Sequence, residues 1–211
     1  MNSKESRKIN LYGASGHAKV ILDIISTLDD VEVAYIFDDD TSVTTLLDRE
    51  VLSPSVHQDK LNEYPLIISV GSNLLREQLV NQLASSSFSK ALVHSSAQIS
   101  KETDILEGSV VMPLAVINAS TKIGTHGIIN SGAVVEHDCR IGDFVHISPK
   151  ACICGGVSIG NGTHIGAGAT VLPNVKISSN CIIGAGAVIL KDVPDGAKVV
   201  GNPAKPIKFH L

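Results

Sequence analysis

Tryptophan is absent from the 211-residue chain, and aromatic residues make up only 3% of it. A core with so few rings must be filled by valine, isoleucine, leucine and alanine, a composition that suits strand-rich, narrow interiors better than a bulky sandwich. The net charge of −4 gives no electrostatic footprint for nucleic acid or for an anionic membrane surface. The expected partners are therefore small molecules or other protein chains.

Long apolar runs are also missing. No stretch reaches the roughly 18 uninterrupted apolar residues that a membrane span needs, and the first residues contain no segment of signal-peptide length. We therefore expect no membrane insertion and a cytoplasmic location. The four cysteines contain no CxxC pair, so the sequence predicts neither a zinc knuckle nor a disulfide framework, and we expect no metal.

Residues 1–90 alternate between strand and helix patterns. Strands are predicted for "KINLYG", "VEVAYIFDDD" and "PLIISVGSN", and amphipathic helices for "HAKVILDIISTL" and "LLREQLVNQLA". Strands separated by helices predict a small Rossmann-like parallel sheet, hence an α/β domain. In such sheets, ligands bind beyond the carboxyl ends of the strands, where Gly13, Asp38 and Gly71 fall.

Residues 91–211 repeat with a period of six. Every sixth residue from Val93 to Ile189 is isoleucine or valine, seventeen in succession, and a mostly small residue follows four places later. This period predicts a parallel β-helix of triangular section, with three hexads to a coil and the branched residues stacked inside; accidental periodicity in a generic all-β domain is the alternative. We expect a positive φ at the glycines that directly follow branched residues, namely Gly124, Gly142, Gly160, Gly166 and Gly184.

The hexads resemble those of the hexapeptide-repeat acyltransferases, whose coils form a left-handed β-helix. "GASGH", "VVEHDC", "FVHISP" and "VVGNPAKPIK" are similar to the sialic acid O-acetyltransferase type of that superfamily. Within it, the chain most resembles bacterial acetyltransferases that modify nucleotide-linked amino sugars, as in bacillosamine synthesis. The resemblance implies acetyl-CoA as co-substrate, a nucleotide-linked amino sugar as acceptor, and a homotrimer with acetyl-CoA between neighbouring prisms.

"VVEHDC", residues 134–139, carries an acid–base pair. Val135 and Cys139 take the inward positions, which puts His137 and Asp138 at a corner with outward side chains. A solvated histidine is the ordinary interpretation of such a position, but a nearby carboxylate favours the protonated imidazole. Transfer from a thioester needs a base, because the attacking amine or hydroxyl must lose a proton. The resemblance assigns that role to His137 and makes Asp138 the acid that enhances it, although glutamate is frequent there in the family.

His146 and His164 lie one coil of eighteen residues apart and should stack on one edge of the prism. Metal binding is the obvious interpretation of a histidine edge, but no carboxylate or cysteine completes a ligand set. By resemblance, His146 contacts the acetyl group of acetyl-CoA, and backbone amides at Ala167 and Ala185 match other acetyl-CoA positions. His126 has no such match and is expected at the surface.

A cysteine nucleophile would form an acyl-enzyme in place of direct transfer within a ternary complex. Cys139 and Cys181 occupy inward positions, which leaves the outward Cys154 as the candidate for that route. Direct transfer is the preferred mechanism. The lysines of "VVGNPAKPIK" fit either the phosphates of CoA or a cap on the last coil.

"LYGASGHAKV" places glycine between a strand and a helix, where backbone amides and the helix N-terminus can face an anion. The segment is not a GxGxxG motif, so the signal for NAD is weak. Further along, "FDDD" supplies carboxylates suited to the hydroxyls or base edge of a nucleotide, and its third aspartate fits a solvated turn. The resemblance maps nucleotide-sugar contacts onto Ser15, Gly16, His17, Asp38, Asp39, Gly71 and Leu75.

The residues together with the resemblance imply an acetyl-CoA-dependent N-acetyltransferase acting on a nucleotide-activated amino sugar, expected to be a UDP-linked 4-amino-4,6-dideoxy sugar. The N-terminal domain would hold the nucleotide and the β-helix the acetyl-CoA. One alternative is O-acetylation of a free sugar such as sialic acid, which would not need the nucleotide contacts. Another is a non-catalytic nucleotide-sugar-binding protein, against which the pairing of His137 with Asp138 argues.

Overall fold

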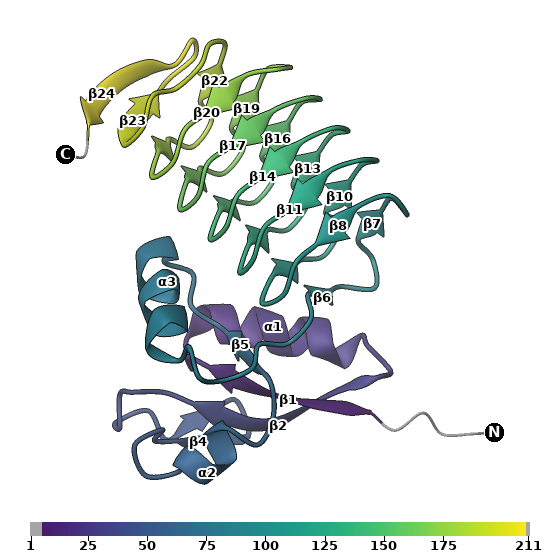
Figure 1. Cartoon of the computed structure of the whole chain (residues 1–211), viewed down its shortest axis with the longest axis vertical. Helices are drawn as coiled ribbons and strands as arrows, with labels where there is room; N and C mark the ends of the chain where they lie inside the picture. The colour runs from purple at the N-terminus through teal and green to yellow at the C-terminus, as the bar shows by residue number, and fades with distance from the viewer. Residues whose placement is uncertain (1–5, 210–211) are drawn as a thin grey trace.

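The computed structural model describes residues 6–209 and begins with a small α/β domain (Figure 1). Its sheet has the strand order β3-β4-β2-β1-β5, and β1 pairs in parallel with both β2 and β5. The parallel sheet is confirmed, whereas the short antiparallel pair of β3 and β4 was not predicted. The strands are β1 (Arg7–Tyr12), β2 (Val31–Phe37), β3 (Thr45–Leu46), β4 (Arg49–Leu52) and β5 (Leu66–Ile68), and the helices are α1 (Gly16–Ser26), α2 (Gln58–Leu61) and α3 (Asn73–Gln82).

The rest of the described chain is a left-handed β-helix of two-residue strands, closed by a longer antiparallel pair (Figure 1). Strands in neighbouring coils pair in parallel at a spacing of eighteen residues, as in Ile129 with Ile147. The strands are β6 (Leu92–Val93), β7 (Gln98–Ile99), β8 (Asp104–Ile105), β9 (Val110–Val111), β10 (Val116–Ile117), β11 (Lys122–Ile123), β12 (Ile128–Ile129), β13 (Val134–Val135), β14 (Arg140–Ile141), β15 (His146–Ile147), β16 (Cys152–Ile153), β17 (Ser158–Ile159), β18 (His164–Ile165), β19 (Thr170–Val171), β20 (Lys176–Ile177), β21 (Ile182–Ile183), β22 (Val188–Ile189), β23 (Ala197–Val200) and β24 (Lys205–Phe209).

These strands form three sheets, one for each side of a triangular prism. We name each side after a central strand. The β12 face is β24-β23-β21-β18-β15-β12-β9-β6, the β13 face is β22-β19-β16-β13-β10-β7, and the β14 face is β20-β17-β14-β11-β8. The predicted three-sided β-helix is therefore confirmed.

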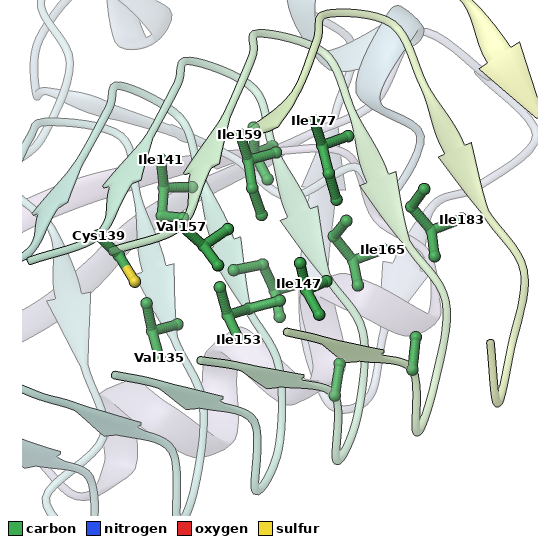
Figure 2. Packing of buried hydrophobic residues seen from close by; sticks show 14 of the residues in the cluster. Val135, Cys139, Ile141, Ile147, Ile153, Val157, Ile159, Ile165, Ile177 and Ile183 are labelled. Carbon is green, nitrogen blue, oxygen red and sulfur yellow. The ribbon is translucent and has the colours of Figure 1, made fainter. Parts of the chain in front are cut away.

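Branched side chains fill the prism interior (Figure 2). Val135, Ile147 and Ile153 are fully buried, and the small residues Cys139 and Ala151 fill the space between them. In a prism this narrow, aliphatic residues stack on copies of themselves one coil away, so the core needs no aromatic ring. This packing accounts for the aromatic-poor composition.

The glycines that directly follow branched residues do not take the expected positive φ. That conformation falls two residues later in each turn, for example at Gly162 (φ 68°) and Asp138 (φ 61°). The first glycine is required for a different reason, which is the close approach of the next coil. A Cβ atom on Gly142 would lie 2.8 Å from the backbone nitrogen of Asn161, and one on Gly166 would lie 2.5 Å from that of Ala185. The prediction was wrong about which turn position needs conformational freedom.

Helix α1 lies between the α/β sheet and the β12 face (Figure 1). Leu92, Val110 and Ile128 point outward from that face, yet each is at most 1% exposed because it packs in one cluster with residues such as Ile21 and Ile25 of α1. Burial of these apolar side chains attaches the α/β domain to the first coils. No helix among residues 6–209 is both long enough and apolar enough to cross a membrane.

Candidate active site

His137 and Asp138 occupy the turn between β13 and β14, at the corner where the β13 and β14 faces meet. Nδ1 of His137 lies 2.8 Å from Oδ2 of Asp138, and the two side chains are 63% and 66% exposed. A carboxylate oxygen accepts a hydrogen bond, so Nδ1 carries the hydrogen and the lone pair is on Nε2. The outward position predicted for both side chains agrees with this geometry, and the imidazole is arranged to accept a proton at Nε2.

Gly155, one coil beyond His137, makes room for the imidazole. The backbone N–H of Gly156 donates to the carbonyl oxygen of His137 at 2.9 Å, which fixes the two coils against each other. A Cβ atom on Gly155 would lie 2.7 Å from Cε1 and 2.8 Å from Nε2 of His137. Sequence reasoning missed this residue, although the eighteen-residue register points to it.

His146 projects from the β12 face toward the loop that follows β5. Its Nδ1 lies 3.3 Å from the carbonyl oxygen of Gly71, and its Nε2 lies 3.0 Å from Nδ2 of Asn130. Since a carbonyl can only accept, Nδ1 donates to Gly71, and Nε2 accepts from the Asn130 amide. Burial is the main cause that lowers the pKa of His146 to about 3, so the imidazole is neutral near pH 7. Its contact with the acetyl group stays a prediction.

Two further histidines lie beside His146. The His164 ring stacks edge-on at 4.9 Å, one coil away, as predicted from the register. His17 lies in the first turn of α1, and burial lowers its pKa to about 4. Its Nε2 is buried and has no hydrogen-bond partner within residues 6–209. Over the same residues, no group of three histidine, cysteine or acidic side chains is placed to hold a metal ion.

The predicted nucleotide residues gather at the carboxyl ends of β1, β2 and β5. Gly13 has a φ of 108°, and a Cβ atom there would lie 2.8 Å from Val70. Asp38 accepts a 2.6 Å hydrogen bond from the backbone of Ala14, and Asp39 accepts a 2.7 Å bond from the Tyr12 hydroxyl. These bonds connect the loop after β1 to the end of β2. Ser15 and Gly16 are exposed at the start of α1.

The loop after β5 and the start of α3 are attached to the prism. Asn73 donates from Nδ2 to the carbonyl oxygens of Gly162 and Thr163 at 3.0 and 3.1 Å. Gly71 lies in this loop, opposite His146, whereas Leu75 is 47% exposed on α3. The structure therefore brings Gly71 next to His146, while the nucleotide-binding roles of the predicted residues stay predictions.

Arg76 on α3 is a buried cation that sequence reasoning missed. It is 1% exposed, and it donates to the carbonyl oxygens of His126, Phe144 and Val70 at 2.9, 3.0 and 3.0 Å. It also bonds to the carbonyl of Gly71 and to the side chain of Asn73. No carboxylate pairs with it within residues 6–209, so backbone dipoles stabilise its charge.

The expectation that His126 lies at the surface was wrong. Its side chain is 3% exposed because the ring stacks on Phe144 at 5.3 Å and meets the edge of Phe88 at 4.7 Å. Burial lowers its pKa to about 4. Phe144 lies one coil away, where the eighteen-residue register points to it, whereas Phe88 lies before the repeats and the hexad pattern does not report its contact.

Ala167 and Ala185 lie one coil apart at the corner between the β12 and β13 faces, and both are exposed. The backbone N–H of Gly186 donates to the carbonyl oxygen of Ala167 at 2.8 Å. His137 lies at a different corner, the one opposite the β12 face. Within one chain, His137 is therefore separated by the width of the prism from the face that carries the α/β domain.

The cysteines lie where the pattern predicts. Cys139 and Cys181 are fully buried, and burial raises the pKa of both thiols. Cys154 is half-buried, and its carbonyl oxygen lies 3.2 Å from the sulfur of Cys139. Cys152 is likewise half-buried, so Cys154 is one of two cysteines that stay partly accessible to solvent.

A parallel α/β domain joined to a hexapeptide-repeat prism, with an exposed imidazole at one corner, defines a hexapeptide-repeat transferase. Residues 8–83 match the family model described as the PglD N-terminal domain, and residues 138–172 and 156–191 match the bacterial transferase hexapeptide model. The chain belongs to the family of hexapeptide-repeat acetyltransferases that carry a PglD-type N-terminal domain. The predicted fold, family and enzyme class are confirmed.

Solved structures are similar over nearly the whole chain. The acetyltransferase domain of PglB from Neisseria gonorrhoeae is 34% identical with a TM-score of 0.88, covering 96% of this chain and 100% of that one. PerB from Caulobacter crescentus, in complex with CoA and GDP-perosamine, is 34% identical with a TM-score of 0.87, covering 95% and 97%. WeeI from Acinetobacter baumannii is 31% identical with a TM-score of 0.84, covering 96% and 100%.

Proposed function

We propose that the protein transfers the acetyl group of acetyl-CoA to the amino group of a nucleotide-linked amino sugar, with a UDP-linked 4-amino-4,6-dideoxy sugar as the expected acceptor. The observation that carries this function is the exposed pair of His137 and Asp138 on the prism of an acetyltransferase family member. Acetyl-CoA is the co-substrate, which agrees with the PglB domain crystallised with acetyl coenzyme A. GDP-perosamine bound to PerB supports an amino sugar carried on a nucleotide.

In this mechanism, His137 is the general base. The acceptor amine attacks the thioester carbonyl, a C–N bond forms, and Nε2 of His137 takes the proton that the nitrogen loses. The C–S bond then breaks, and the imidazolium returns the proton to the leaving thiolate of CoA. Asp138 keeps the hydrogen on Nδ1 and stabilises the imidazolium through a charge-assisted hydrogen bond. No covalent intermediate on the protein is required.

The active site is shared between two copies of the chain. The proposed nucleotide residues lie on the side of the β12 face, near Gly71 and His146, whereas His137 lies at the opposite corner of the same prism. An amino sugar held by one α/β domain can therefore meet His137 only on a neighbouring chain. A homotrimer with acetyl-CoA between adjacent prisms, along Ala167 and Ala185, satisfies this requirement.

The β13 face suits the contact between prisms. From β10 to β22 its outward residues are small or branched, namely Val116, Val134, Cys152, Thr170 and Val188, and β7 adds the polar Gln98. None of them is charged, and together they form a flat strip on short strands that another prism can cover. The β14 face carries charged residues in the corresponding positions, so the two faces differ in what they can pack against.

The test is incubation of the purified protein with acetyl-CoA and a panel of UDP-, GDP- and dTDP-linked amino sugars together with free sialic acid. Thiol release reports turnover, and mass spectrometry identifies the acetylated product and the modified atom. N-acetylation of a nucleotide amino sugar is the expected outcome. Turnover with sialic acid alone would identify an O-acetyltransferase, and binding of a nucleotide sugar without thiol release would identify a non-catalytic binding protein.

A further inference from the structure

The β14 face holds a groove of about 510 Å³ that the proposed catalysis does not use. Its outward side chains follow one another at one per coil: Lys122, Arg140, Ser158 and Lys176. The three cations are exposed. Successive coils lie about 4.8 Å apart, so this face presents a row of positive charge along the prism.

Arg140 and Lys176 are the cations of this row that form no ion pair within residues 6–209. Lys122 pairs with Asp104 at 3.6 Å, and Asp195 lines the groove at the end that Lys176 occupies. The planar guanidinium of Arg140 is therefore available to an anion, and it can contact two phosphate oxygens at once.

Arg140 also borders the proposed catalytic corner. It is the first residue of β14, directly after the turn that carries His137 and Asp138. Arg140 thus lines the groove and lies two residues after Asp138 in the chain. An acceptor whose amine reaches His137 extends either along the β13 face, where the prisms are proposed to meet, or over the β14 face, where Arg140 lies.

The proposed nucleotide site has little positive charge of its own. Its ionisable side chains are Asp38, Asp39 and His17, and His17 is neutral near pH 7 because burial lowers its pKa to about 4. Arg76 is buried, and its hydrogen bonds already go to oxygen atoms of the chain. The exposed cation nearest to this loop in sequence is Lys19 on α1. The backbone amides at the start of α1 can face a phosphate of a nucleoside diphosphate bound here, but the side chains of the site add no full positive charge to them.

We propose that Arg140 of one subunit binds the diphosphate of the nucleotide sugar held by the α/β domain of the neighbouring subunit. This inference rests on the proposed function and its shared site. It makes Arg140 a binding residue that selects for an acceptor carrying a diphosphate, and it gives the charged β14 face a role beside the catalytic corner. A free sugar would gain nothing from this contact.

The first experiment compares the purified full-length Arg140→Ala variant with wild type. Loss of a charge-assisted bond to phosphate should raise KM for the nucleotide sugar about tenfold, with little change in kcat or in KM for acetyl-CoA. Arg140→Lys should restore part of the loss, since it keeps the charge without the forked geometry. Lys176→Ala, on the same face two coils away, is the matched control and should behave as wild type.

A second experiment isolates the phosphates. The nucleoside diphosphate alone should bind or inhibit about tenfold more weakly in Arg140→Ala, whereas the corresponding nucleoside should be unaffected. This measurement by calorimetry needs no turnover, so it tests the contact even if the proposed acetyl transfer fails. An unchanged affinity for the diphosphate would overturn the proposal. If Arg140→Ala raised only the KM for acetyl-CoA, the groove would be assigned to CoA and the proposal would be wrong. It would also be wrong if Lys19→Ala, and not Arg140→Ala, weakened the binding of the nucleoside diphosphate.

Discussion

The imidazole of His137 bonds to the carboxylate of Asp138, its neighbour in the chain, across 2.8 Å. Asp138 adopts a φ of 61°, the left-handed conformation that recurs once in each turn of the prism. This turn conformation brings two consecutive side chains together on the outside of the corner. The β-helix thus supplies an oriented imidazole without any contribution from the α/β domain.

Replacement of this imidazole gives the first prediction. His137→Ala should lower kcat by roughly 10²–10⁴-fold, the usual contribution of a positioned proton acceptor, while both substrates still bind. The melting temperature should change little because the side chain is 63% exposed. Asp138→Asn should lower kcat by less, since the imidazole remains. A His137→Ala enzyme with near-normal kcat would contradict the mechanism and turn attention to Cys154.

Gly155 gives a second prediction. Gly155→Ala would place a methyl group 2.7 Å from the His137 ring, so the imidazole must move and kcat should fall about tenfold or more. A double-mutant cycle with His137→Ala isolates this contact. In the His137→Ala background, where the ring is gone, the added methyl should have no further effect on the residual rate. An equal loss in both backgrounds would mean that Gly155 acts through something other than the ring.

The parts of the fold that could be predicted depend on local patterns. The hexad period identified the buried residues, such as Ile147, because each coil repeats the same environment. The pair of His137 and Asp138 was predictable because the two residues are adjacent. Gly155 and Arg140 follow from the same register, since one lies a coil beyond His137 and the other begins the next side.

Contacts between the two parts of the chain could not be predicted. Arg76 reaches carbonyls 50 and 68 residues away, and Asn73 reaches 89 and 90 residues along the chain. No periodicity records such pairings. His126 occupies a turn position like many exposed ones, and it is buried because its ring contacts both Phe144 and Phe88, of which Phe88 lies outside the repeats. The same limit applies to His146, whose partner Gly71 lies in the other domain.

Arg76 gives a third prediction, on stability. Arg76→Met should destabilise the protein by about 3 kcal/mol or more, because it leaves several buried carbonyls without donors. Arg49→Met, at an exposed position, is the matched control and should change stability by less than about 0.5 kcal/mol. Thermal unfolding followed by circular dichroism measures both. Equal melting temperatures for the two variants would show that the buried guanidinium makes no net contribution to the stability of the fold.

The buried histidines give a fourth prediction, on pH. The pKa values of His17 and His146 are lowered to about 4 and about 3, so between pH 6.5 and 4 the unfolded chain binds protons that the folded chain does not. Stability should therefore fall as the pH drops through this window and level off below about pH 3. His146→Asn should flatten the profile in part, because it removes one of the buried neutral imidazoles. A wild-type profile that is flat from pH 6.5 to 4 would contradict the burial of neutral imidazoles.

The last prediction tests whether the site is shared between chains. His137→Ala lacks the proposed base, and Asp38→Ala lacks a proposed nucleotide contact, so each variant alone should turn over slowly at a low concentration of nucleotide sugar. In mixed trimers formed by co-expression with two tags, some interfaces combine an intact α/β domain from the His137→Ala chain with an intact His137 from the Asp38→Ala chain. Those interfaces should recover wild-type kinetics.

The matched control is a chain that carries both substitutions, mixed with wild type. In this control mixture, every site between a double-variant chain and a wild-type chain lacks either His137 or Asp38. Activity therefore comes only from interfaces between two wild-type chains. Light scattering should give the mass of a trimer for all samples. The activity of the His137→Ala and Asp38→Ala mixture should exceed the mean activity of the two single-variant trimers. Such an excess requires a site built from two subunits, because a site contained in one chain would keep its defect in every trimer. An activity of the mixture equal to the mean of the two single variants would rule out the shared site, and so would a monomeric mass in light scattering.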